Sequence, residues 1–246
     1  MTPYLQFQFL EKRYGAVTAL SEINLTVERG DVLALLGPNG AGKSTLFGCL
    51  LDFTRPTAGT ILQNGEPITV MQPQNFGYMP ERIALYPHSS VFENGIFFAQ
   101  LKGQPARELE RQLQRVGLYH VRDRQARQLS KGMLQRLGLA IALCGEPELL
   151  ILDEPFNGLD PALLETLQAM LAEERRRGAT ILVSTHTMSA VEPLATHVAV
   201  LLEGRLAVHS SIEELRRAHS ESASLEVIYH RIAREQRPDI AQEVFA

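Results

Sequence analysis

The sequence predicts an α/β fold that also contains an antiparallel β portion and a helical insertion. A continuous apolar segment, Val32–Leu36, runs directly into a glycine-rich loop and a helical segment at 43–51, as expected for a buried strand followed by a helix. Asn64–Gly65 separates two short β-like runs, which is a strong hairpin signal. Between about 83 and 145 the apolar periodicity is mostly helical, and the alternation of strands and helices resumes after this segment.

The remaining elements follow from apolar runs and from capping residues. Strands are expected at 4–10, 23–27, 149–153, 180–184, 197–202 and 205–209. Helices are expected at 91–102, 105–116, 130–144, 161–177, 187–194 and 212–219. Ser90 and Glu93 form the pattern of a capping box, and Pro105 stands where a first helical residue is expected. We expect one domain over 1–220, with the helical subdomain at about 83–145 inserted, and a short C-terminal tail over 221–246 that begins with helical spacing.

Composition indicates an ordinary globular protein with no nucleic-acid partner. The chain has 246 residues, of which 45% are hydrophobic and 21% are charged, so a packed core is expected rather than disorder. The formal net charge is -4 and the isoelectric point is near 6.0. Nucleic-acid-binding domains are usually basic, so this balance argues against that class.

Cysteine usage is typical of a protein in the reducing cytosol. Cys49 and Cys144 lie in apolar helix-like stretches without metal-ligand spacing, which is typical of buried free thiols in a reducing compartment. The N-terminus predicts no signal peptide. No apolar stretch approaches the roughly 20 residues that span a bilayer, so a membrane function would require another subunit.

The segment GPNGAGKS, at 37–44, fits the phosphate-loop pattern and has a strand before it and a helix after it. Glycines let backbone N–H groups curl around phosphate oxygens, and the helix N-terminus adds partial positive charge. Lys43 supplies a full charge to the β- and γ-phosphates, and the Ser44 hydroxyl suits Mg²⁺. The loop residues expected to bind a nucleotide triphosphate are Gly37, Pro38, Asn39, Gly40, Ala41, Gly42, Lys43, Ser44 and Thr45.

The apolar strand at 149–152 ends in two carboxylates, Asp153 and Glu154. Adjacent residues at a strand end point to opposite faces, so the two groups are expected to have different roles. Asp153 can reach Mg²⁺ through water, whereas Glu154 can orient the attacking water as a base or hydrogen-bond acceptor. Alone, such a pair would be a helix cap or a solvated pair at a sheet edge, and the phosphate loop favours the catalytic interpretation.

LSKGM, at 129–133, precedes the Asp–Glu strand at the start of a predicted helix. With the other motifs it resembles the signature of ATP-binding-cassette (ABC) ATPases, and the resemblance covers nearly the whole chain. It implies that two ATP molecules are buried between two head-to-tail cassettes, a homodimer in this case. Ser130, Lys131 and Gly132 would then face the γ-phosphate held by the opposite subunit. Ser130 would also cap its helix and direct the helix N-terminus at an anion.

The resemblance assigns roles to three further positions. Tyr14 resembles the aromatic residue that stacks on adenine, and 157–160 (NGLD) resembles the loop that contacts the dimer partner, called the D-loop. Its N-x-x-D spacing also occurs in a GTPase base-reading motif, but that motif needs lysine where Gly158 stands. His186 resembles the switch histidine that senses the γ-phosphate, so Glu154 and His186 are the expected catalytic residues.

The sequence also departs from the family pattern at three positions. Glu81 stands where the family usually has glutamine, at the loop between the α/β core and the helical subdomain, and its carboxylate can still bind Mg²⁺. The expected metal-binding residues are therefore Ser44, Glu81 and Asp153. Lys131 replaces a glycine and Met133 a glutamine of the signature. Lys131 could add a cation near the partner's phosphate and so assist ATP-driven dimerisation, or could point to solvent.

With these departures, the sequence resembles one branch of the family, the single-cassette ATPases that pair with a separate permease of the ABC-2 type. The run LSKGMLQRLGLA is similar to ATPase subunits of transporters that mature nitrous oxide reductase, a function associated with copper or sulfur supply. The resemblance implies hydrolysis of ATP to ADP and phosphate on the cytoplasmic face of the inner membrane, with a permease and a possible periplasmic partner. An ABC-2-type exporter ATPase for a drug, lipid or polysaccharide, a soluble ABC protein acting on ribosomes or DNA, and a phosphate-loop kinase or GTPase are the alternatives.

Overall fold

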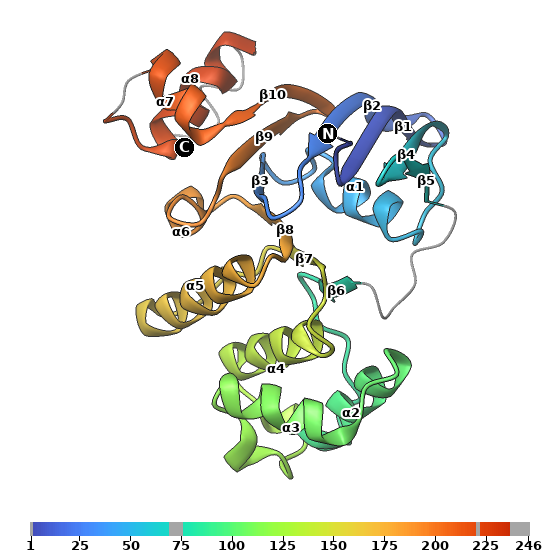
Figure 1. Cartoon of the computed structure of the whole chain (residues 1–246), viewed down its shortest axis with the longest axis vertical. Helices are drawn as coiled ribbons and strands as arrows, with labels where there is room; N and C mark the ends of the chain where they lie inside the picture. Colours follow the sequence, from blue (N-terminus) through green and yellow to red (C-terminus); the bar gives the residue numbers. More distant parts are fainter. Residues whose placement is uncertain (1, 69–75, 220–221, 237–246) are drawn as a thin grey trace. The chain divides into compact units, whose positions relative to one another are not determined.

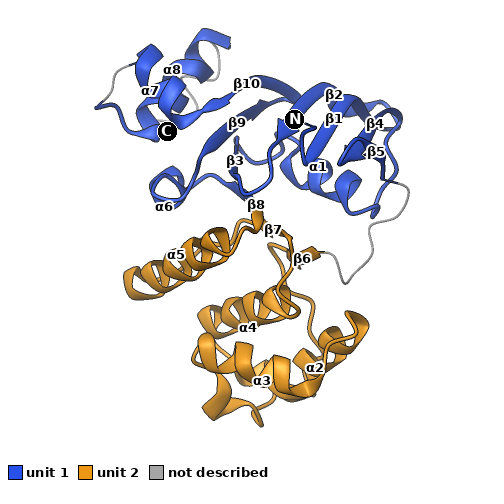
Figure 2. Cartoon of the chain, in the orientation of Figure 1, with its two compact units in different colours: residues 1–70, 182–246 blue, residues 71–181 orange. Residues whose placement is uncertain are grey.

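The computed structural model describes residues 2–68, 76–219 and 222–236, and the chain divides into two compact units. Unit 1 consists of residues 1–70 and 182–246, and unit 2 of residues 71–181 (Figure 2). Strand β8 (Thr180–Thr185) begins in unit 2 and continues into unit 1. No helix in the described ranges is both long and apolar enough to span a membrane.

An antiparallel sheet with the strand order β2-β1-β4-β5 forms the first part of unit 1 (Figure 1). Its strands are β1 (Leu5–Tyr14), β2 (Val17–Val27), β4 (Ala58–Gln63) and β5 (Glu66–Pro67). The β1–β2 hairpin extends from the pair Leu5 and Val27 to the pair Tyr14 and Val17. The predicted turn at Asn64–Gly65 is confirmed, with both residues at positive φ between β4 and β5.

A second sheet carries the glycine-rich loop of unit 1. Its order within this unit is β10-β9-β3-β8, with β3 (Val32–Leu36) parallel to β9 (His197–Leu202) and β10 (Arg205–Ser211) antiparallel to β9. All five residues of β3 are buried, as the continuous apolar run predicts. Helix α1 (Lys43–Leu50) follows the loop at the end of β3.

The described part of unit 1 also contains the helices α6 (Met188–Val191), α7 (Ile212–His219) and α8 (Leu225–Gln236). The helical spacing expected after residue 221 is confirmed by α8, which packs against α6 and α7 (Figure 1). Glu192, directly after α6, links α7 and α8. Its carboxylate accepts a hydrogen bond from the Arg216 guanidinium of α7 at 2.9 Å and one from the Leu225 backbone N–H of α8 at 3.1 Å.

Unit 2 contains a parallel strand pair and mostly helical structure. Strand β6 (Phe76–Met79) pairs with β7 (Leu149–Asp153), and the helices are α2 (Val91–Leu101), α3 (Ala106–Arg115), α4 (Lys131–Leu143) and α5 (Pro161–Arg176). Short 3₁₀ turns lie at Tyr119–Val121 and Ala126–Gln128. Helices α2, α3 and α4 pack against one another (Figure 1).

Local signals predicted most helix ends in unit 2. The capping box before α2 is confirmed: the Glu93 N–H donates to Ser90 Oγ at 3.0 Å, and the Ser90 N–H donates to Glu93 Oε2 at 2.7 Å. Pro105 is the N-cap of α3 rather than its first residue, so that prediction is wrong by one position. The sequence analysis missed β6, because this four-residue strand depends on its pairing with the distant β7.

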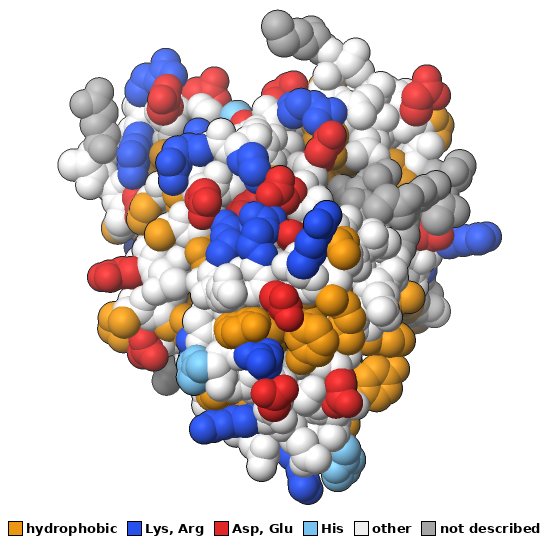
Figure 3. Space-filling view, turned by 60° about the horizontal axis from the view of Figure 1, so that its bottom comes forward, with side chains coloured by type: hydrophobic (Ala, Val, Ile, Leu, Met, Phe, Trp, Pro, Cys, Tyr) orange, Lys and Arg blue, Asp and Glu red, His pale blue; other side chains and the backbone are white. Residues whose placement is uncertain are grey.

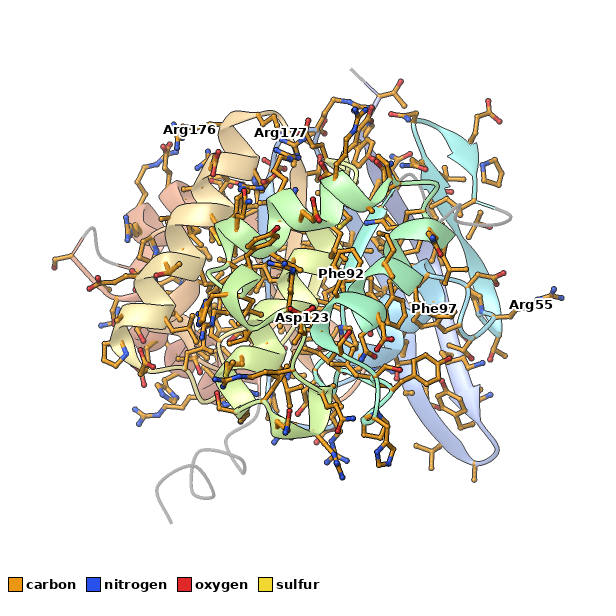
Figure 4. All side chains as sticks on the ribbon, turned by 90° about the horizontal axis from the view of Figure 1, so that it is seen from below. Arg55, Phe92, Phe97, Asp123, Arg176 and Arg177 are labelled. Atoms are coloured by element: carbon orange, nitrogen blue, oxygen red, sulfur yellow. The ribbon has the colours of Figure 1, made fainter. Side chains whose placement is uncertain are left out.

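Charged side chains connect helices of unit 2. Lys102 donates to the carbonyl oxygens of Ala142 at 3.0 Å and Cys144 at 2.7 Å, which satisfies groups left open at the end of α4. Burial lowers the pKa of Lys102 to about 8 and raises the pKa of the Cys144 thiol to about 11. The buried Glu174 of α5 pairs with Arg115 of α3 and with Arg177, which lies at the end of α5 (Figure 4).

Candidate functional site

The phosphate loop lies in unit 1 between β3 and α1, as the sequence predicts. Lys43 is only 6% exposed, and its ammonium lies over the loop, where it donates to the carbonyl oxygens of Gly37 at 2.8 Å and Pro38 at 3.2 Å. Ser44 is exposed at the start of α1, and Thr45 is half-buried. A held ammonium beside a helix N-terminus suits a phosphate group.

Two glycines of this loop are required by their surroundings. A Cβ at Gly37 would lie 2.3 Å from the carbonyl oxygen of Leu201, which is backbone and cannot move aside. Gly42 has φ 106°, and a Cβ there would lie 2.6 Å from the carbonyl oxygen of Ala19. The loop can therefore pack tightly against β2 and β9 only with glycine at both positions.

The turn between β9 and β10 braces the phosphate loop, which the sequence analysis missed. The Gly204 N–H donates to the Ala41 carbonyl oxygen at 2.9 Å, and the Gly204 carbonyl accepts from the Ser21 N–H at 2.8 Å. The turn itself was predicted at Gly204 from the flanking strands. Its contact with a loop more than 160 residues earlier has no local signal in the sequence.

Tyr14 and His186 are the other predicted site residues of unit 1. Tyr14 is the last residue of β1 at the tip of the β1–β2 hairpin, and it is 51% exposed. His186 is exposed directly after β8. Their exposure leaves both rings accessible to a ligand.

In unit 2 the two carboxylates are buried at the end of β7. Asp153 is 4% exposed and Glu154 is 6% exposed. Glu154 has φ 51°, a strained conformation for a residue with a Cβ, and such strain often occurs at functional sites. Burial raises the pKa of Tyr78 on β6 to about 12, and the negative charge of Asp153 contributes to this shift.

The predicted signature forms the start of α4. Ser130 is the N-cap of this helix, and its Oγ accepts from the Met133 backbone N–H at 3.3 Å. Ser130 and Lys131 are exposed and Gly132 is half-buried. The start of this helix therefore combines the dipole's partial positive charge with the Lys131 ammonium.

The signature helix is joined to the predicted D-loop by two contacts within unit 2. Gln135, only 8% exposed, donates from Nε2 to the Asn157 carbonyl oxygen at 2.8 Å. The Lys131 ammonium lies beside Gly158, where a Cβ would be 2.6 Å from Nζ. Asp160 then caps α5 by accepting from the Leu163 N–H at 2.9 Å. The sequence analysis missed Gln135, because only the tertiary structure brings α4 beside this loop.

The donor set suits Mg²⁺ chemically. Ser44 offers a hydroxyl, and Asp153 and Glu81 offer carboxylates, so all three supply the hard oxygen ligands that this cation prefers. Glu81 is exposed in the bend after β6. Among the described residues, no cluster of three or more His, Cys, Asp or Glu side chains is placed to hold a metal ion.

Each unit thus carries a different part of the predicted site. Unit 1 contains the phosphate loop, Tyr14 and His186. Unit 2 contains Glu81, Asp153, Glu154 and the signature. One part can hold a triphosphate, and the other offers a carboxylate for activating water and a helix N-terminus for an anion.

Comparisons with known proteins identify the family of this chain. Residues 20–157 match the family model described as ABC transporter. The lantibiotic transport ATP-binding protein SrtF of Streptococcus pyogenes is 38% identical over 202 residues, covering 82% of this chain and 88% of that protein. The Nod factor export ATP-binding protein I of Cupriavidus metallidurans is 38% identical over 222 residues, covering 87% of this chain and 73% of that protein.

A solved structure of an ATP-binding subunit of an ABC transporter has the same fold. It superposes with a TM-score of 0.85 at 31% identity, over 94% of this chain and 99% of that chain. The predicted fold class, an ABC cassette with an antiparallel β portion and a helical subdomain, is confirmed by this similarity.

Proposed function

This chain belongs to the ABC transporter family as an ATP-binding subunit, and from that premise we propose that it hydrolyses ATP to power a separate membrane permease. The observation that carries the proposal is the Lys43 ammonium held over the phosphate loop, in a chain that also has a Ser130-capped signature helix. A nucleotide-binding protein of another class would need the loop but not this signature.

The residues divide the chemistry between them. Backbone N–H groups of the loop and Lys43 bind the triphosphate, and the exposed ring of Tyr14 receives the base. Glu154 orients the attacking water and accepts its proton, while His186 contacts the γ-phosphate. Ser44, Asp153 and Glu81 are the residues that would hold Mg²⁺, and the cation would supply charge neutralisation at the phosphates.

Two copies of the chain complete the site in this proposal. Ser130, Lys131 and Gly132 of one copy face the γ-phosphate bound by the other, so ATP closes the homodimer and hydrolysis opens it. The contact between Lys131 and Gly158 supports a role for this lysine at the dimer surface, because it groups the signature cation with the D-loop. Lys131 would add one positive charge where the partner's phosphate arrives.

Lys131→Gly is therefore expected to weaken ATP-driven dimerisation by about tenfold, the effect of losing one charge-assisted contact. The measurement is light scattering after size exclusion, over a series of ATP concentrations. Arg107→Gly, on exposed α3 surface of the same unit, controls for loss of one positive charge. Unchanged ATP-dependent dimerisation and hydrolysis in Lys131→Gly would remove Lys131 from this role.

The helical insertion at about 83–145 is the proposed contact with the permease. Its aromatic surface, defined as Tyr86, Phe97 and Phe98, has ring centroids 5.6 Å apart for Tyr86 and Phe97 and 5.2 Å apart for Phe97 and Phe98. Tyr86 is 55% exposed and Phe97, on α2 in Figure 4, is 42% exposed. Hydrophobic side chains also gather on the face shown in Figure 3. Exposed apolar surface of this kind favours a protein partner.

The finer proposal is a role in nitrous oxide reductase maturation, with the chain on the cytoplasmic face of the inner membrane and copper or sulfur supply as the associated transport. A periplasmic partner protein would then receive the cargo. The run at 129–140 and Glu81 support this branch. The named relatives act in lantibiotic transport and Nod factor export, which supports an ABC-2-type exporter for another substrate as the alternative.

Co-expression with an ABC-2-type permease tests the partner. We expect the tagged chain to recover the permease from detergent-solubilised membranes, and Phe97→Ser to reduce recovery severalfold by removing apolar contact area. Val227→Ser removes a similarly exposed apolar side chain from α8 and serves as the control. Recovery of ribosomes or DNA in place of the permease would contradict the transporter function.

A further inference from the structure

Lys12 lies on β1 two residues before Tyr14, and its side chain is held by two contacts. Its ammonium is 4.7 Å from the centroid of the Tyr14 ring, within the range of a cation–π interaction. The same ammonium donates to the carbonyl oxygen of Arg55 at 2.7 Å. Lys12 and Tyr14 share one face of the strand, because side chains alternate along it.

The Arg55 carbonyl belongs to a segment that is itself fixed beside β1. The Thr57 N–H donates to the Glu11 carbonyl oxygen at 2.7 Å, and the Arg13 N–H donates to Thr57 Oγ1 at 3.0 Å. The group that accepts the hydrogen bond from Lys12 is therefore a backbone carbonyl in a segment fixed by its own hydrogen bonds to β1.

Within unit 1, strand β2 contacts the phosphate loop close to the hairpin tip that carries this pair. Ala19 follows Val17, the cross-strand partner of Tyr14, by two residues. Its carbonyl oxygen lies where a Cβ of Gly42 would come within 2.6 Å, at the N-terminus of α1. The charge of Lys12 also reaches α1: burial raises the pKa of the Cys49 thiol, and Lys12 partly opposes that shift.

We propose that Lys12 is a positioning residue for the purine base of the bound nucleotide. Its ammonium occupies one face of the Tyr14 ring and fixes the ring's orientation, which leaves the opposite face for stacking. A cation on one face also withdraws electron density from the ring and so reduces repulsion against an electron-rich purine on the other. The inference rests on the proposed ATP-binding function and adds a residue that the phosphate-loop and signature motifs do not include.

The central test compares ATP with inorganic tripolyphosphate, which lacks the base. Lys12→Met keeps a long apolar side chain and removes the charge. We expect it to weaken ATP binding about two- to fivefold, the range of an exposed cation–π contact, and to raise KM with kcat unchanged. Tripolyphosphate, measured as a competitor of a fluorescent ATP analogue, should bind the wild type and the variant equally.

Three further variants make the assignment specific. Lys12→Arg keeps a cation over the ring and is expected to bind ATP with the wild-type affinity. Arg13→Met removes the neighbouring charge, whose Nε contacts Thr18 Oγ1 at 3.3 Å instead of the ring, and should leave ATP affinity unchanged. In a Tyr14→Ala background, Lys12→Met should have no further effect, because the ring through which it acts is gone.

The outcomes separate this inference from the proposed function. Wild-type ATP affinity in Lys12→Met, equal weakening of ATP and tripolyphosphate, or full additivity with Tyr14→Ala would each overturn the role of Lys12 and leave the ATPase assignment intact. Failure of the folded wild-type chain to bind ATP at all would overturn the proposed function, and this inference with it.

Discussion

Glu154→Gln is expected to reduce ATP turnover by about 10²- to 10⁴-fold while ATP binding persists, because an amide cannot accept the proton of the attacking water. The substitution keeps the size of a side chain that is 6% exposed, so no cavity forms. Glutamine also tolerates φ 51° about as well as glutamate, so backbone strain does not change. Steady-state phosphate release and equilibrium ATP binding are the two measurements.

Glu165→Gln is the matched control for this experiment. Glu165 is exposed on α5 of the same unit, so the same chemical change there should leave turnover within twofold of wild type. The Glu154→Gln variant should also retain an ATP-bound dimer, since in the proposed cycle closure of the dimer precedes hydrolysis. Wild-type turnover in Glu154→Gln would remove Glu154 from its assigned role.

Lys43→Ala is expected to weaken ATP binding by at least about 100-fold, equivalent to about 3 kcal/mol for a charge-assisted phosphate contact. The ammonium also bonds to the carbonyl oxygens of Gly37 and Pro38, so its removal frees the loop it now holds. Isothermal titration measures the affinity directly. The rise in Tm that ATP produces in the wild type should also be lost.

Lys12→Met is the control for Lys43→Ala, because it also removes one lysine charge from unit 1. It is expected to weaken ATP binding only a few-fold. The unfolding temperature without ATP checks that Lys43→Ala is folded. ATP affinity within tenfold of wild type in a folded Lys43→Ala would contradict the phosphate-binding role of Lys43.

The departures from the family pattern concentrate in unit 2. Lys131 lies beside Gly158, and Gln135 bonds to Asn157, so changes in the signature and in the D-loop act on one connected surface. A residue larger than glycine at position 158 would meet the lysine ammonium, and this contact links the two positions physically. Experiments on the proposed dimer closure should therefore substitute Lys131 and Gly158 singly and together, because residues in contact do not act independently.

Segments governed by contacts over a few residues could be predicted from the sequence. The Ser90 capping box, the Asn64–Gly65 turn and the Ser130 cap all involve hydrogen bonds or φ preferences within about four residues, so composition and spacing determine them. The buried run of β3 before a glycine-rich loop predicted the phosphate loop for the same reason.

Strand β6 and the brace on the phosphate loop required the tertiary structure. Four residues form β6 only because β7, about 70 residues later, offers a parallel partner. The Gly204 N–H reaches Ala41 only once β9 lies beside β3. A backbone hydrogen bond to a distant residue leaves no periodicity or spacing in the chain, so it cannot be inferred from sequence.

Local patterns in the sequence predicted the candidate site groups: a phosphate-binding loop, a carboxylate pair after a buried strand and a serine at the start of the predicted signature helix. The contacts that support these groups emerge only in the tertiary structure. The Gly204 N–H bonds to the Ala41 carbonyl oxygen, Gln135 bonds to Asn157, and the Lys12 ammonium lies over the Tyr14 ring. The two kinds of feature differ in how far apart along the sequence the interacting residues lie. Reactive groups and caps are encoded within a few residues, whereas the contacts that orient them form between segments that only packing brings together.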